Sequence, residues 1–420
     1  TLSGNGEADA YVLSQTVTIN LNGKTLTGGI QLYAANLTID GSAPNSKMNG
    51  SIRCDHGSDR LTINGGTYTN DTGSFLTVDS INTLTITAGE FIGGTHALNL
   101  SAKQVEYVRN ITGGTFHGIY VNNSYVCVKD CRSEGYRFEE NGNPIKLSEL
   151  ATSSTSKTLT VVRCDSHSWE DDVTQKSCEY CGKTNLAYGA VAEVGGTYYS
   201  NLTEALNAAA SSGKPVTLLQ NAMPEGDGAL YTQSAGTTLT INLNGYTLLK
   251  ASDGRGGILM PKSKEATLNV NGPGKVEGTI WCNEDNSLTI QGGSYGEIRA
   301  KNVTALNISG AEVNYLNVEA PSDGNGAYKR LNVTSGTIHS AWGYPNVMYC
   351  LAAGYCFQDS SGKPVDLTQL TNSSLLGDWD DYTTTYTVAQ CTSHSFKSDP
   401  TQENCVYCGT LNPNKAEAGM

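Results

Sequence analysis

The chain has 420 residues, and its 40 acidic and 27 basic side chains give a net charge of −13 without any basic cluster. This charge argues against nucleic acid as a partner, and no apolar run approaches the roughly 20 residues that a bilayer-spanning helix needs. The 47 Gly and 22 Tyr, with only 11 Pro, favour short strands joined by turns. We therefore expect a mainly β protein.

Short segments with alternating apolar and polar residues recur along the chain, and a glycine follows most of them. Their central residues are Ile39, Ile63, Ile86 and Ile111 in the first half and Val270, Ile290, Ile308 and Val333 in the second. The intervals are 24, 23 and 25 residues, then 20, 18 and 25. One short strand per interval cannot bury its apolar face alone, so the copies must stack as coils. This predicts a right-handed parallel β-helix; a leucine-rich repeat needs a denser leucine pattern.

A different kind of segment lies between the two halves. Residues 192–199 resemble a hairpin, residues 202–210 have helical spacing after the capping candidates Ser200 and Asn201, and residues 216–220 form a strand pattern. We expect this short helix to cap the first coil of the second unit. The first unit has no counterpart, because Thr1 aligns with the region near Met223. The first unit therefore begins inside the repeat.

The chain contains the same unit twice. The hexapeptide TINLNG at 18–23 returns at 240–245, and CDSHSWEDDVTQKSCEYCG at 164–182 returns as CTSHSFKSDPTQENCVYCG at 391–409. The predicted order is a β-helix unit over 1–163 with a truncated cap, a zinc element over 164–186 and a cap or linker over 187–228. A second β-helix unit over 229–390, a second zinc element over 391–412 and a tail over 413–420 complete it.

Each copy ends in four soft metal ligands within 18 residues. The two sets are Cys164, His167, Cys178 and Cys181, and Cys391, His394, Cys405 and Cys408. Zinc favours tetrahedral ligation by thiolate and imidazole, and each C-x2-C pair supplies two thiolates from one turn. Disulfides are the alternative, but they leave one cysteine over in each unit and give the histidine no role. We expect two zinc sites that are structural, because four protein ligands leave no position for water.

The remaining cysteines are predicted to be free thiols or to form local disulfides, depending on the pair. Cys54 and Cys282 occupy matching strand positions, and we expect both to be buried free thiols. Cys127 with Cys131, and Cys350 with Cys356, are either free or close small loops as disulfides in an oxidising compartment.

No catalytic motif stands out. Carboxylate candidates, such as Asp55, Asp59, Glu139 with Glu140, Asp171 with Asp172, Glu284 with Asp285, and Asp378 with Asp380 and Asp381, do not recur with the same residues in both units. We therefore expect a protein that is not an enzyme. The alternative is a polysaccharide lyase or glycosidase, whose catalytic groove would be assembled from distant residues.

The segments TYYSNLTEALNAAASSGKPVTLLQNA, TLTINLNGYTL and CTSHSFKSDPTQENCVYCG resemble the repeat modules of large secreted surface proteins of Gram-positive bacteria. The resemblance implies an extracellular adhesin or stalk on the bacterial cell surface, a monomeric fragment of a larger protein, with a host protein or glycan as partner. Nothing in the fragment indicates membrane insertion, and its first residues lack a signal-peptide pattern. Candidates for exposed side chains that contact the partner are Tyr295, Tyr315, Trp342 and Tyr344; the alternative is that these aromatic residues pack in turns.

Overall fold

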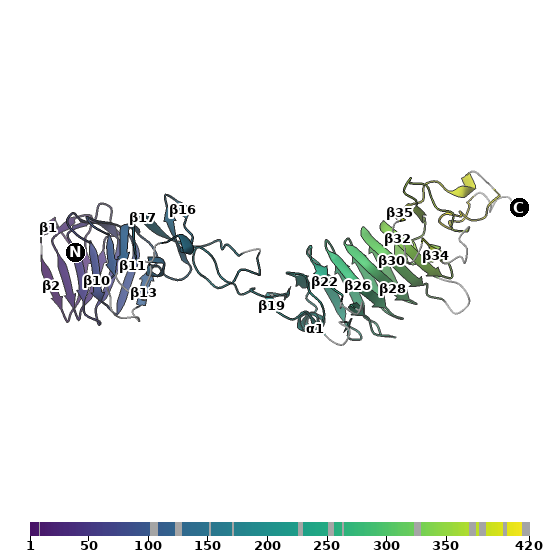
Figure 1. Cartoon of the computed structure of the whole chain (residues 1–420), viewed down its shortest axis with the longest axis horizontal. Coiled ribbons are helices and arrows are strands. Elements are labelled where there is room, and N and C mark those ends of the chain that lie inside the picture. The colour runs from purple at the N-terminus through teal and green to yellow at the C-terminus, as the bar shows by residue number, and fades with distance from the viewer. Residues whose placement is uncertain are drawn as a thin grey trace. The chain divides into compact units, whose positions relative to one another are not determined.

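The computed structural model describes the chain except residues 8, 101–107, 122–127, 151–152, 170–171, 226–229, 251–255, 263, 323–328, 369–374, 378–383, 398–400 and 414–420. Two compact units, Thr1–Tyr188 and Gly189–Met420, are each a parallel β-solenoid whose strands lie side by side as successive rungs (Figure 1). The mainly β, parallel β-helix prediction is confirmed. Within the described residues, no helix has the length and apolar character needed to cross a membrane.

Unit one is built from three parallel ladders. The first joins β3 (Thr16–Asn20), β6 (Asn36–Asp40), β9 (Arg60–Asn70), β11 (Thr83–Gly93) and β13 (Val108–Ile111). The second joins β2 (Ala10–Leu13), β5 (Ile30–Tyr33), β8 (Ile52–Asp55), β10 (Leu76–Ser80), β12 (Leu98–Leu100) and β14 (Thr115–Val121). The third joins β1 (Gly6–Glu7), β4 (Thr25–Thr27) and β7 (Lys47–Asn49) to further parts of β9, β11 and β14.

The register of the first ladder follows the sequence period. Ile39 pairs with Ile63, which pairs with Ile86, which pairs with Ile111, and the first three side chains have no exposed surface. A slip of one residue would turn this whole row to solvent, so its burial fixes the register.

The third ladder holds a column of buried aromatic rings. Tyr68 and Phe91 stack with centroids 5.0 Å apart, and Phe91 and Phe116 with centroids 4.9 Å apart; both interplanar angles are 7°. A glycine stands two residues before each ring, and a Cβ at Gly89 would come within 3.0 Å of the Phe91 ring. Glycine therefore leaves room for the ring inside each coil.

Unit two has two parallel ladders. One joins β20 (Val216–Leu218), β22 (Thr238–Asn242), β25 (Thr267–Asn271), β27 (Ser287–Gln291), β29 (Ala305–Ser309) and β31 (Asn332–Val333). The other joins β21 (Leu230–Thr232), β24 (Gly257–Leu259), β26 (Lys275–Cys282), β28 (Ser294–Lys301), β30 (Ala311–Glu319) and β32 (Gly336–Tyr344), with β23 (Thr247–Leu248) beside β26. Their apolar faces share one buried core.

The expected cap is present at the start of unit two. Strands β18 (Ala192–Val194) and β19 (Thr197–Tyr199) form the hairpin, and α1 (Leu202–Ser212) follows. Asn201 caps the helix, because its side chain accepts a hydrogen bond of 3.1 Å from the Glu204 amide. The buried helix residues Leu202 and Leu206 belong to the core of the first coils, so α1 covers their apolar surface.

Each solenoid ends in antiparallel strands, which the sequence analysis did not anticipate. In unit one, β17 (Ser154–Arg163) pairs with β14 and with β15 (Tyr136–Glu140), beside β16 (Asn143–Pro144). In unit two, β35 (Tyr386–Gln390) pairs with β32 and β33 (Tyr355–Gln358), and β34 (Leu375–Leu376) pairs with β32. Short 3-10 turns are η1 (Val128–Cys131), η2 (Leu147–Glu149), η4 (Val347–Cys350) and η5 (Ser395–Lys397). The last strand leads directly into the Cys/His element in both units.

Candidate metal centres

The closing strand of each unit positions the first ligand. Cys164 directly follows β17 and its amide donates to the Gly135 carbonyl at 2.9 Å; Cys391 directly follows β35 and its amide donates to Gly354 at 2.8 Å. These bonds continue the ladders to β15 and β33 by one residue. The first cysteine of each set is therefore held by the sheet itself.

The last two cysteines of each set lie in a tight turn. The Gly182 amide donates to the Cys178 carbonyl at 2.8 Å, and the Gly409 amide donates to the Cys405 carbonyl at 2.7 Å. Gly182 and Gly409 have φ values of 73° and 69°, the left-handed region that a side chain disfavours. This is why glycine follows both C-x2-C pairs.

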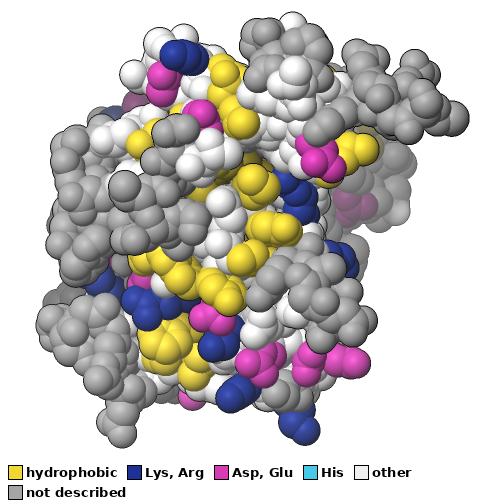
Figure 2. Space-filling model, turned by 90° about the vertical axis from the view of Figure 1, so that its right-hand side faces the viewer, with side chains coloured by type: hydrophobic (Ala, Val, Ile, Leu, Met, Phe, Trp, Pro, Cys, Tyr) yellow, Lys and Arg dark blue, Asp and Glu magenta, His cyan; other side chains and the backbone are white. Residues whose placement is uncertain are grey.

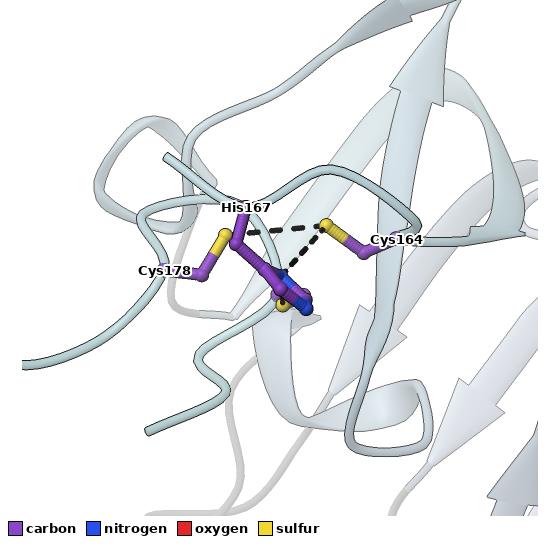
Figure 3. Close-up of side chains that lie close together, drawn as sticks. Cys164, His167 and Cys178 are labelled. Carbon is purple, nitrogen blue, oxygen red and sulfur yellow. Dashed lines mark hydrogen bonds between the residues drawn. The ribbon is translucent and has the colours of Figure 1, made fainter. Parts of the chain in front are cut away.

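The structure brings together all eight predicted ligands in two groups of four. In each group the ligand atoms lie within 4.8 Å of one another, with the cysteines buried and the histidine half-buried. From Cys164 Sγ the distance is 3.6 Å to His167 Nδ1 and 3.9 Å to Cys178 Sγ (Figure 3). Cys181 Sγ lies 3.4 Å from His167 Nδ1. In unit two, Cys408 Sγ lies 3.4 Å from His394 Nδ1. Each group could hold one metal ion.

Both histidines turn Nδ1 toward the sulfurs, and an aromatic ring two residues later fixes the imidazole plane. His167 stacks on Trp169 and His394 stacks on Phe396, in both cases with centroids 4.9 Å apart. The interplanar angles are 16° and 11°. Such contacts orient a ligand before the metal arrives.

The same polar contacts occur in both units and hold the ten-residue loop between the histidine and the second cysteine of each group. Ser168 Oγ accepts from the Glu179 amide at 2.9 Å, and its counterpart Ser395 Oγ accepts from the Val406 amide at 3.0 Å. Gln175 and Gln402 contact these hydroxyls, and Asn185 and Asn412 tie the loop ends. All three residue types recur at equal positions in both copies, which is the signal that the sequence analysis missed.

The thiols of the first group have unequal affinities for protons. Burial raises the pKa of Cys164, and it raises the pKa of Cys181 to about 12. Burial acts in the same direction on Cys178, but hydrogen bonds, chiefly from backbone amides, outweigh it and hold the pKa of Cys178 at about 6; Cys405 in unit two has the same value for the same reasons. One thiolate per group is thus favoured before a metal binds.

A desolvated arginine lies beside each group. Burial lowers the pKa of Arg132, next to Cys181, and of Arg330, next to Cys408. Arg132 Nε and Arg330 Nη1 are buried without a hydrogen-bond partner among the described residues. A divalent ion with three thiolates and a neutral imidazole carries one net negative charge, which is the charge that a buried guanidinium needs nearby. The surroundings therefore fit a metal–thiolate centre.

Four cysteines outside the two groups, Cys54, Cys282, Cys350 and Cys356, are free thiols. Cys54 and Cys282 are fully buried free thiols, as expected. Cys350 and Cys356 are also free, so of the two alternatives for this pair the structure has the free thiols; the pair Cys127 with Cys131 stays untested, because Cys127 lies outside the described residues. Cys356 turns instead toward the second metal centre and packs with Cys391, Cys405 and Cys408.

The remaining candidates divide between the core and the surface. Tyr295 was a candidate for an exposed side chain, but it is 1% exposed because it occupies the aromatic position of its coil, two residues after Gly293. Tyr315 and Trp342 are half-buried and Tyr344 is 51% exposed. Asp59 is fully buried and accepts from the amides of Ala35 and His56, which makes it a structural acceptor. Asp171, Asp378, Asp380 and Asp381 lie outside the described residues.

A scan against protein-family models, a search of curated proteins and a search of solved structures each find no match. The fold and the site define the class of protein by themselves. It is a β-solenoid protein of two units, each of which carries a Cys3His group that could hold a metal ion.

Proposed function

We propose that the chain is a non-enzymatic repeat protein of the bacterial cell surface, an adhesin or stalk, in which a structural zinc ion closes each β-solenoid. The observation that carries the proposal is the recurrence of one Cys3His geometry directly after the antiparallel closing strand of both units. A solenoid needs a terminal element that protects its last coil, and a metal-clamped loop serves this purpose.

The distances support zinc. Zn–S bonds of about 2.3 Å and Zn–N bonds of about 2.05 Å in a tetrahedron place two sulfurs about 3.8 Å apart and a sulfur and a nitrogen about 3.5 Å apart. The corresponding distances here are 3.9 Å for Cys164 Sγ to Cys178 Sγ, and 3.6 and 3.4 Å from His167 Nδ1 to Cys164 Sγ and Cys181 Sγ. Four protein ligands in this shape leave no open coordination position, so the role is structural.

A row of outward side chains on unit two supports a binding role. In-register pairing places Trp281, Arg299, Asn317 and Trp342 on successive rungs of β26, β28, β30 and β32. Rungs are about 4.8 Å apart, so the two tryptophans are separated by roughly 14 Å. Trp281 is 39% exposed and the Arg299 guanidinium lies 5.1 Å from its ring centroid. Flat aromatic and polar groups of this kind suit a glycan or a protein partner.

The charge pattern favours a partner without a high charge density. On the face drawn in Figure 2, acidic and basic side chains lie among hydrophobic ones and form no broad field of one sign. Together with the net charge of −13, this supports a glycan or host protein and not a nucleic acid.

The test has two parts. Metal analysis of the purified chain is expected to find two zinc ions per chain; finding none, with the ligand cysteines joined as disulfides, would contradict the metal role. A glycan and host-protein array is then probed with the chain and with Trp281→Ala. The variant is expected to lose a signal that the control Tyr188→Ala, an exposed ring in unit one, retains. No binding by the unmodified chain would leave a passive stalk.

A further inference from the structure

A fourth sulfur lies beside the second metal centre. Cys356 on β33 pairs with Ala389, and Tyr355 pairs with Gln390, so Cys391 lies diagonally across the antiparallel pair on the same face as Cys356. The Cys356 thiol is fully buried and in hydrogen-bonding contact with that of Cys391. It belongs to the same buried cluster as Cys405 and Cys408. The second centre thus has four thiols and one imidazole within one cluster.

The first centre has an arginine at this position. The segments GYRFEE at 135–140 and GYCFQD at 354–359 match, which places Arg137 where unit two has Cys356. Arg137 Nη1 lies 4.0 Å from Cys164 Sγ, and Glu139 binds the guanidinium at 2.8 and 3.0 Å. Unit two lacks both members of this pair, since Cys356 stands in place of Arg137 and Gln358 in place of Glu139. In unit one this position holds a positive charge beside the ligand Cys164, whereas in unit two it holds a thiol that could itself bind the metal ion.

Two neighbouring thiols can form a disulfide or bind one metal ion together, and the distance between the two residues favours one of these outcomes. Diagonal neighbours on an antiparallel pair are about 7–8 Å apart, which is at or beyond the Cα separation of roughly 7 Å that a disulfide tolerates. Two thiolates on one zinc ion need sulfurs only about 3.8 Å apart. A shared metal ion therefore fits this pair better than an S–S bond.

We propose that Cys356 is a reserve sulfur ligand of the second centre, which makes this centre a thiol-rich site for thiophilic divalent ions such as Zn²⁺ and Cd²⁺. When Cys391 is lost, Cys356 takes its coordination position and the ion stays. The first centre cannot do this, because Arg137 has no thiolate to offer. The inference rests on the proposed metal binding at these centres.

The test compares matched ligand losses in the full chain. The Cys164→Ser and Cys391→Ser variants are loaded with Zn²⁺ and freed of loosely bound metal, and the number of ions per chain is measured. In a parallel sample loaded with Co²⁺, the charge-transfer absorption reports ligation by thiolates. We expect about two ions in the unmodified chain and in Cys391→Ser, but about one in Cys164→Ser. Cys356→Ser with Cys391→Ser is expected to bind about one.

A second variant introduces the Cys356 thiol at the matching position of unit one, so that a gain of metal binding tests the proposal even if a ligand variant folds poorly. Adding Arg137→Cys and Glu139→Gln to Cys164→Ser is expected to restore the second ion to the chain. If the unmodified chain binds two ions but Cys391→Ser and Cys164→Ser lose metal equally, Cys356 is not a reserve ligand. The proposed metal binding at both centres is unaffected by that result. A second centre without metal in the unmodified chain would overturn the proposed metal role itself. A Cys356–Cys391 disulfide in the metal-loaded chain, found by mass spectrometry, would also overturn the reserve ligand.

Discussion

Phe91 stacks on Tyr68 with the two ring planes 7° apart, and neither side chain has any exposed surface. Phe91 also stacks on Phe116, so it is the middle ring of the column that fills the third ladder of unit one. Truncating it leaves a cavity that neighbouring coils cannot close, because backbone ladders fix the rung spacing.

Phe91→Ala is expected to destabilise unit one by about 3–5 kcal/mol. Phe91→Leu keeps most of the volume and is expected to cost clearly less, although it loses the ring stacking. Urea unfolding followed by circular dichroism measures both, with the exposed-ring variant Tyr33→Ala as the control. Equal stability of the alanine variant and the unmodified chain would contradict the packing role of the column.

The first ladder was predictable from the sequence because its signal is local. Alternation buries every second residue, and the repeat of 23–25 residues brings Ile39, Ile63, Ile86 and Ile111 into register. The aromatic column was equally visible as Gly-x-aromatic, at Gly66, Gly89, Gly114 and Gly293, but each ring taken alone resembles a surface residue. That is why Tyr295 was a candidate for an exposed side chain.

The two groups of four candidate metal ligands were predictable from spacing, whereas their surroundings depend on strand pairing. Cys356 and Cys391 are 35 residues apart, and only the antiparallel register of β33 and β35 makes them neighbours. Arg132 and Arg330 occupy unmatched positions in the two copies, yet each lies beside its metal group. Sequence comparison within the chain could not pair them.

Metal removal is expected to expose only the ligand cysteines. With a chelator, the three cysteines of each centre should react with iodoacetamide, since the loops lose their clamp. Cys282 and Cys350 should stay unreactive in the folded chain, because burial raises the pKa of each to about 12. Mass spectrometry of labelled peptides measures this. Rapid labelling of Cys282 in the folded, metal-free chain would show that the solenoid itself depends on the metal.

Zinc is also expected to raise the stability of the chain. Free zinc at about 1,000 times its Kd stabilises a folded site by about 4 kcal/mol. Thermal unfolding with and without chelator measures the difference, and a chain with Cys178→Ser and Cys405→Ser is the control that should not respond. An equal response in that control would assign the effect to other binding sites.

The stability of unit two is expected to fall as pH rises above about 8.5. The folded pKa of Cys282 is raised to about 12 from an ordinary value near 8.5, so its contribution is complete below about pH 8.5 and is lost as the pH approaches 12. At pH 9.5 the unfolded thiol ionises and the folded one does not, which costs about 1.4 kcal/mol. Comparing unfolding of Cys282→Ala with the unmodified chain at pH 7.5 and 9.5 isolates this contribution. A difference that does not change with pH would contradict it.

Arg132 is expected to strengthen metal binding at the first centre by charge. Its guanidinium is desolvated beside Cys181, and a bound divalent ion with three thiolates supplies the compensating negative charge. Replacing Arg132 by Met keeps the apolar volume and removes the charge, so metal affinity should fall about 10–100-fold, the usual effect of losing an outer contact of a metal site. Arg163→Met is the matched control, because Arg163 is exposed and pairs with the exposed Asp165. Competition with a chromophoric chelator measures both affinities in the full chain, where the unmodified second centre is the internal reference. If Arg132→Met and Arg163→Met bind metal equally well, the guanidinium acts only by packing against the turn at Gly182.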